Sequence, residues 1–158
     1  MGDLLGRRQI RARQWGLAGV AFVALATFAW LVIRAQTLPT GPQPIQWDHA
    51  VCAHCKMHVG SPGSAAQAQR VDGSVLNFDD PGCLIAWLPS QSPPPRAVYF
   101  HHHAENRWLE SPQVGFLSGG VTPMGSGLRA VETSHPGAVS WEDVLKRGAA
   151  KSVQKEAP

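Results

Sequence analysis

The sequence predicts an α+β domain with a small antiparallel sheet, and three observations lead to this fold class. Stretches typical of strands and helices follow in the order strand, strand, helix, strand, then strand, strand, helix, which favours an antiparallel sheet covered by helices. Six tryptophans and 13 prolines are many for 158 residues and indicate a loop-rich fold. Without its apolar N-terminal segment the chain keeps roughly 110 to 120 residues, enough for one small domain.

The apolar segment covers residues 15–33 and carries no charge. A bilayer core needs about 20 helical residues, so we expect a transmembrane anchor over 15–33. Trp15 and Trp30 lie near its ends, as interfacial aromatic residues do. The alternative is a cleaved signal peptide, but its apolar region is normally about 7 to 15 residues long, and residues 33–35 form a poor cleavage site.

Charge predicts the orientation of this anchor. Four arginines lie in residues 1–14 and one follows the apolar segment, so we expect a cytoplasmic basic segment over 1–14 and a periplasmic C-terminal domain in the bacterial inner membrane. No basic stripe occurs elsewhere, so no nucleic-acid partner is expected. Residues 34–46 contain three prolines and predict a Pro-rich linker, which places the domain at 47–148.

The first half of the domain reads as a hairpin, a helix and a strand. Residues 65–71 and 74–78 are strand candidates around an Asp-Gly turn. Asp79 or Asp80 can cap a helix that begins near Pro81 and stops at Pro89. Residues 97–100 are continuously apolar and predict a buried strand.

The second half predicts further short elements. Residues 108–117 are mixed and include a strand candidate at 114–117, and residues 128–133 predict another strand. Ser140 can cap a short helix over 140–147. The tail at 149–158 is charged and rich in small residues, so we expect it to be flexible.

Metal-binding side chains are concentrated directly after the linker. Cys52, His54, Cys55, Met57 and His58 place two thiols, two imidazoles and a thioether within seven residues. These soft and borderline donors favour Cu(I), or Zn(II) if thiolate and imidazole dominate. Cys55 and Met57 share a face if the segment is extended. The motif therefore predicts metal handling outside the cytoplasm.

Four other interpretations of Cys52 and Cys55 remain open. They can form a structural disulfide, because the periplasm is oxidising. A thioredoxin-like redox pair needs a helix start after a strand, whereas a proline-rich linker precedes this pair. A closed zinc site needs a second ligand pair, which the sequence lacks nearby. A c-type haem site normally has His where this chain has Lys56.

Other potential ligands lie farther along the chain. Met124 sits in the glycine-rich loop 122–127, where a thioether has access to a neighbour. Residues 101–103 are three histidines at a strand end, and the simplest interpretation is a polar terminus. Cys83 is flanked by apolar residues and reads as a small buried hydrophobe. No nucleophile–base–acid set and no phosphate loop stands out, so we do not expect an enzyme.

Five separated motifs occur in order over residues 48–133. They are Cys52-x-x-Cys55-x-Met57, Ala65-Ala66-Gln67, Phe78-Asp79-Asp80-x-Gly82-Cys83, Trp87 and Thr122-Pro123-Met124-Gly125-x-Gly127. Together they resemble the NosL family of periplasmic copper chaperones. The resemblance implies a NosL/organomercurial lyase-like fold of ββαβ-type units. It also implies that Cys55, Met57 and Met124 bind Cu(I), with Cys52 as a further ligand and Cys83 ranked lower.

The resulting expectation is a membrane-anchored periplasmic Cu(I) metallochaperone. It would deliver copper by ligand exchange at Cys and Met side chains to a cuproenzyme such as nitrous oxide reductase, or receive copper from a donor protein. Cys52, His54 and His58 are the additional candidate ligands beside Cys55, Met57 and Met124. The alternative is a thiol-disulfide oxidoreductase that uses Cys52 and Cys55.

Overall fold

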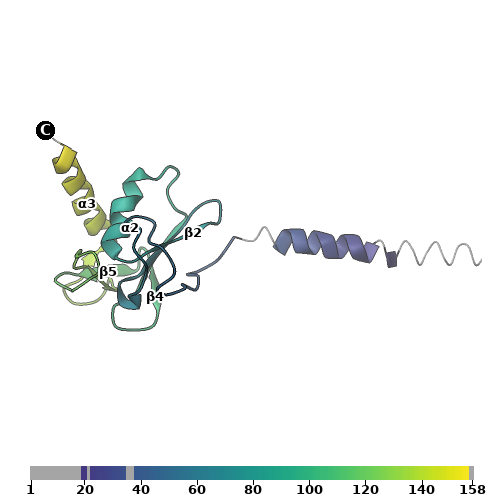
Figure 1. The fold of residues 1–158 in the computed structure, drawn as a ribbon, viewed down its shortest axis with the longest axis horizontal. Helices are drawn as coiled ribbons and strands as arrows, with labels where there is room; N and C mark the ends of the chain where they lie inside the picture. Colours follow the sequence, from purple (N-terminus) through teal and green to yellow (C-terminus); the bar gives the residue numbers. More distant parts are fainter. Residues whose placement is uncertain (1–18, 21, 35–37, 157–158) are drawn as a thin grey trace, which may run out of the picture. The chain divides into compact units, whose positions relative to one another are not determined.

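A computed structural model describes residues 19–20, 22–34 and 38–156, and the chain divides into the units 1–38 and 39–158. In the first unit, residues 22–34 are helical (Figure 1). Among the described residues, no helix is both long and apolar enough to cross a bilayer. The basic segment 1–14, and residues 15–18 and 21 of the expected anchor, lie outside the described part. The transmembrane anchor therefore stays a prediction.

A four-stranded antiparallel sheet forms the centre of the second unit. Its strands lie in the order β2 (Val75–Phe78), β1 (Ala66–Gln69), β3 (Ala97–His101) and β4 (Trp108–Glu110). A 3-10 turn, η1 (Pro62–Ser64), leads into β1. The predicted hairpin, with its Asp-Gly turn, and the strand that follows the helix are confirmed.

The residues just before the domain belong to the folded unit. The Gln67 side chain on β1 is buried, accepts the N–H of Gln43 at 2.8 Å and donates to the Gln43 carbonyl at 2.8 Å. Gln69, also buried, donates to the carbonyl of Gly41. Buried amides on β1 thus satisfy backbone groups of Gly41 and Gln43. The folded unit consequently begins at Pro39, before the expected boundary at 47.

A second antiparallel sheet contains three strands, in the order β6 (Arg129–Glu132), β5 (Val114–Leu117) and β7 (Val139–Ser140). The sequence predicts one small sheet, whereas the structure has two. Phe100 of β3 meets Phe116 of β5 edge to face, with 5.0 Å between ring centroids, and Trp141 lies 5.2 Å from Phe100. These buried aromatic side chains join the two sheets in one core.

Two capped helices pack beside each other on this core (Figure 1). The first helix, α2 (Pro81–Trp87), begins after Asp80, which accepts the N–H of Gly82 at 2.7 Å, and η2 (Leu88–Ser90) follows it. The second, α3 (Trp141–Glu156), begins after Ser140, whose Oγ accepts the N–H of Asp143 at 3.3 Å. Both predicted caps are confirmed. The backbone of α3 is helical to Glu156, well beyond the expected end at 147.

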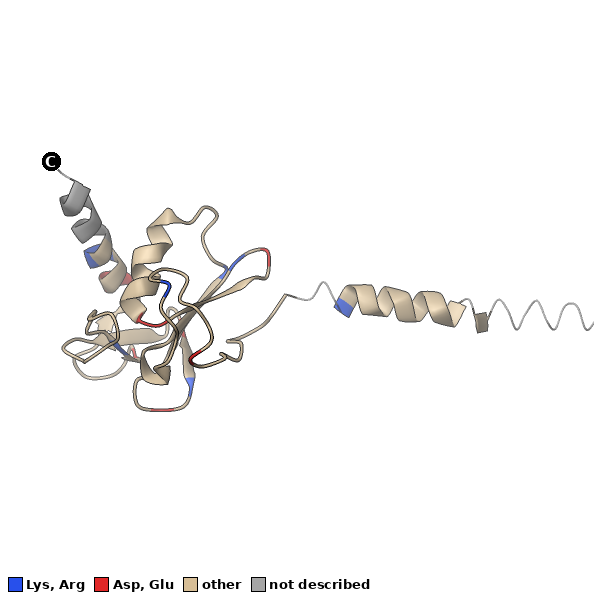
Figure 2. Ribbon diagram, in the orientation of Figure 1, with Lys and Arg blue, Asp and Glu red and all other residues tan. Residues whose placement is uncertain are grey.

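Charged side chains are spread over the second unit. Figure 2 shows its described lysines and arginines on several separate elements rather than along one face. The absence of a nucleic-acid partner remains a prediction, in keeping with this distribution.

Candidate metal centre

Three cysteines that are far apart in the sequence come together in the folded unit. The Sγ atoms of Cys52, Cys55 and Cys83 all lie within 4.8 Å of one another. Cys52 and Cys83 are buried, whereas Cys55 is half-buried. Of the described His, Cys, Asp and Glu residues, these form the one group of three or more with ligand atoms this close together. We call this group the thiol cluster.

A tight turn brings Cys55 back against Cys52. The N–H of Cys52 donates to the carbonyl of Met57 at 2.8 Å, and the N–H of Lys56 donates to the carbonyl of Cys52 at 3.1 Å. Lys56 has a φ of 66°, in the left-handed region that residues other than glycine seldom adopt. Its Nζ donates to the carbonyl of Ala53 at 2.7 Å, inside the same turn. The turn is therefore held by both backbone and side-chain bonds.

Backbone contacts fix this turn next to α2. Cys52 forms a parallel bridge with Asn77 of β2, and the N–H of Ala53 donates to the Asn77 carbonyl at 2.9 Å. Asp79 accepts the N–H of Gly60 at 3.2 Å. Because β2 leads directly into α2, these contacts set the turn against the helix that carries Cys83.

The sulfur of Cys52 lies in an environment that favours the thiolate. Burial alone raises the pKa of this thiol, but backbone N–H groups of Asp79, Cys55 and His54 donate to its sulfur. A further bond from the Cys55 side chain adds to them, and together they hold the pKa of Cys52 below its ordinary value. Thiolate is the form that binds metal ions.

The pKa of Cys83 is shifted in the opposite direction, above its ordinary value. Burial raises its pKa strongly, and the negative charge of Cys52 raises it further. The Cys83 thiol also forms hydrogen bonds to the sulfurs of Cys55 and Cys52, which favour its protonated form. A bound cation would take the place of that shared proton, since metal binding to thiols releases protons.

Asp80 links the first turn of α2 to the loop that contains Met124. One carboxylate oxygen accepts the N–H of Gly82, and the other accepts the N–H of Met124 at 3.0 Å. Burial raises the pKa of Asp80, but hydrogen bonds from Ser126, Thr122 and these two N–H groups outweigh it and hold the pKa low. Asp80 thus keeps its charge and holds the loop against the helix that bears Cys83.

The other predicted ligands lie at the protein surface. Met57 is 51% exposed and Met124 46% exposed, and His54 and His58 are exposed as well. The two histidines are not members of the thiol cluster. The structure therefore brings together two of the predicted ligands, Cys52 and Cys55, and adds Cys83.

Cys83 was expected to be apolar filler and ranked below the other candidates. It is buried, as predicted, but its sulfur faces two other sulfurs. The available signal was its place in the first turn of a helix capped by Asp80, directly after the β1–β2 hairpin. The apolar neighbours of Cys83 on α2 do not reveal that its sulfur faces other sulfurs, because they suit a buried ligand and a buried hydrophobic residue equally well.

The arrangement can hold a metal ion in a set of three soft sulfur donors, with access from the side of Cys55. The comparisons with known proteins add no further constraint, since the chain matches no family model, no curated protein and no solved structure.

Proposed function

We propose that the chain is a membrane-anchored periplasmic metallochaperone that binds Cu(I) at the thiol cluster and delivers it to a cuproenzyme such as nitrous oxide reductase. The observation that carries the proposal is the convergence of three sulfurs within 4.8 Å. The N–H groups around Cys52 support it, because they stabilise a thiolate before any metal arrives.

The size of the donor set favours Cu(I) over Zn(II). Structural zinc is almost always bound by four protein ligands in a tetrahedron. Among the described His, Cys, Asp and Glu residues, the group has three members and all are sulfur donors. Soft thiolate ligands suit both Cu(I) and Zn(II), so the preference for Cu(I) rests on the lack of a fourth member in this group.

Unequal exposure of the sulfurs supports delivery rather than storage. Cys52 and Cys83 are buried, Cys55 is half-buried, and Met57 beside them is half-exposed. An incoming ligand would reach the ion from the side of Cys55 and Met57 and displace these donors stepwise, with the buried sulfurs released last. In this mechanism the ion is cargo, and the protein is not an enzyme.

The test is a Cu(I) titration of the reduced full-length protein in lipid nanodiscs, in competition with a chromogenic Cu(I) chelator. The parent protein should bind one equivalent, and Cys52→Ser with Cys55→Ser should abolish this binding. Met57→Leu should retain binding but slow the transfer of copper to the chelator. His49→Gln, at an exposed histidine, is the control. Stoichiometric binding by the double cysteine variant, or displacement of Cu(I) by equimolar Zn(II), would contradict the proposal.

The second candidate is a thiol-disulfide oxidoreductase, and the lowered pKa of Cys52 favours it. Burial of the Cys52 sulfur argues against it, because an attacking thiolate must reach its substrate. Catalytic turnover of a disulfide substrate separates the two functions. The chaperone should react at most once per molecule, whereas an oxidoreductase turns over repeatedly with a reductant present.

A further inference from the structure

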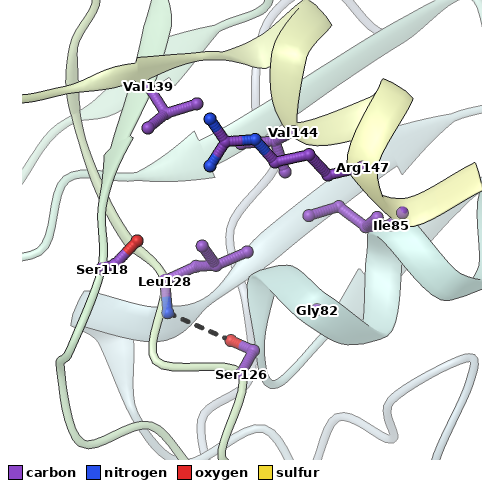
Figure 3. A pocket seen from close by; sticks show the side chains of 9 residues that line it. Gly82, Ile85, Ser118, Ser126, Leu128, Val139, Val144 and Arg147 are labelled. Carbon is purple, nitrogen blue, oxygen red and sulfur yellow. Dashed lines mark hydrogen bonds between the residues drawn. The ribbon is translucent and has the colours of Figure 1, made fainter. Parts of the chain in front are cut away.

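A cavity of about 360 Å³ lies between α2, α3 and the second sheet (Figure 3). Its walls are mainly the apolar side chains of Ile85, Leu128, Val139 and Val144. A volume of 300–1,000 Å³ with mostly apolar walls is typical of small-molecule sites. None of the three cysteines lines the cavity, so it is separate from the thiol cluster.

At two positions in the wall of this cavity, a glycine backbone lies close to a neighbouring side chain. A Cβ atom added at Gly82 would come within 2.6 Å of Cβ of Ser126, and one added at Gly148 would lie 3.0 Å from Ile85. Ser126 Oγ also accepts the N–H of Leu128 at 3.3 Å, the bond drawn in Figure 3. Gly82 and Gly148 therefore allow neighbouring side chains to approach closely at the edge of the cavity.

One cation is placed over this apolar space. Figure 3 shows the Arg147 side chain extending from α3 across the cavity toward Val139. Among the ion pairs and hydrogen bonds of the described residues, none involves Arg147. Its neighbour Lys146, in contrast, lies 3.8 Å from Asp143. The guanidinium thus has its donors available to a ligand.

We propose that the cavity binds a small apolar carboxylate. Its hydrocarbon part would lie against Ile85, Leu128 and Val144, and its carboxylate would accept hydrogen bonds from the guanidinium of Arg147. An arginine fork matches a carboxylate with two parallel N–H···O bonds, which specifies the anion, while the apolar walls supply area for burial. This site is independent of metal binding.

The experiment compares 4-phenylbutyrate with its neutral analogue 4-phenylbutanamide by NMR titration of the reduced full-length protein in lipid nanodiscs. The carboxylate should cause saturable shifts of the backbone amides of Gly82, Leu128 and Val139, and the amide should bind about tenfold more weakly. Arg147→Gln should weaken carboxylate binding by about the same factor and leave amide binding unchanged. Lys146→Gln, the neighbouring charge on α3, is the matched control and should change neither.

Three results would overturn the proposal. The first is a dissociation constant above about 10 mM for the carboxylate in the parent protein. The second is equal affinity for the carboxylate and the amide. The third is an equal loss of carboxylate binding in the Arg147 and Lys146 variants, which would indicate general attraction to the charge of α3 rather than a site.

Discussion

Two regions of the folded unit contain side chains of the kinds that can bind metal ions, but only one places them close enough together to form a candidate site. The thiol cluster brings three sulfurs within 4.8 Å of one another. Residues 101–103, the histidine segment, provide three imidazoles at the end of β3, two of them buried. No described metal-ligand group includes them. The number of suitable side chains is the same, so their arrangement makes the difference.

The ring nitrogens of His101 and His102, the two buried residues of the histidine segment, already have polar partners within the protein. His101 Nδ1 lies 3.0 Å from the carbonyl of His102, and its Nε2 lies 3.3 Å from Asn106. His102 Nδ1 accepts the N–H groups of Ala104 and Glu105, at 3.2 Å and 3.0 Å. These bonds cap the turn after β3. In the thiol cluster, by comparison, N–H groups stabilise the charge of a sulfur that still faces two others.

The comparison indicates that a side chain of a metal-binding type is a candidate ligand when its lone pair faces those of other such side chains and is not used in a hydrogen bond. In the histidine segment, His101 Nδ1 donates to a carbonyl oxygen and His102 Nδ1 accepts two N–H groups, so both imidazoles stabilise the end of the strand, in keeping with the simple interpretation of a polar terminus. The thiol cluster leaves sulfur atoms facing one another, where a bound cation would offset the cost of burial and of like charge.

The largest expected effect is a difference in Cu(I) affinity between a variant in the thiol cluster and a variant in the histidine segment. Cys83→Ser should lower Cu(I) affinity by about 100-fold or more, because substitutions that merely support a ligand cost about 10- to 100-fold. His102→Gln should leave the affinity unchanged. Competition titrations with a Cu(I) chelator measure both. Equal affinities for the parent and Cys83→Ser would remove Cys83 from the ligand set, and a loss in His102→Gln would break the contrast between the regions.

Asp80→Asn tests the support of the thiol cluster and should cost about 2 kcal/mol of folding free energy, as expected for a lost bond to a charged group. The amide oxygen can still accept the Gly82 N–H, but the amide nitrogen would face the Met124 N–H, donor against donor. Urea unfolding of the apoprotein measures the change. Asp72→Asn, at an exposed turn, is the matched control and should stay within about 0.5 kcal/mol. Equal losses of unfolding free energy in the two variants would refute the role of Asp80 in holding the Met124 loop against α2.

The smallest effect is a pH dependence from the histidine segment. Burial holds the pKa of His102 below its ordinary value, against the opposing charge of Glu105, while Arg107, His101 and His135 lower it further. The unfolded chain binds a proton below about pH 6.5 that the folded form resists, so stability should fall as pH drops from about 6.5 toward 5.

His102→Gln should reduce this slope, because Gln does not titrate; the part that remains is expected from His103, whose pKa burial also lowers. Glu132, whose Oε2 lies 3.8 Å from His102 Nε2, is unchanged in that variant. Urea midpoints measured from pH 5 to 7.5 give the slope, and His49→Gln is the control at an exposed histidine. A slope that survives His102→Gln intact would assign the pH dependence to other groups.

Much of the fold follows from local signals in the sequence. The Asp-Gly turn between β1 and β2, the caps at Asp80 and Ser140 and the apolar run of β3 depend on residues a few positions apart, and all were predicted correctly. The division into two sheets was not predicted, because strand pairing depends on long-range contacts such as that of Phe100 with Phe116. The folded linker was missed for the same reason: its partners, Gln67 and Gln69, lie on β1.

The candidate site divides in the same way. The sequence by itself indicated that Cys52 and Cys55 lie close together, because two cysteines three positions apart can meet within one turn whatever the rest of the chain does; it left their role open and implied Cys55 and Met57 as copper ligands only through the family resemblance. Only the tertiary structure decided that Cys83 completes the group and that the histidine segment does not. The direction of a buried side chain is set by the packing of β2, α2 and the turn at residues 52–57, and a cysteine among apolar neighbours does not reveal that direction in its sequence.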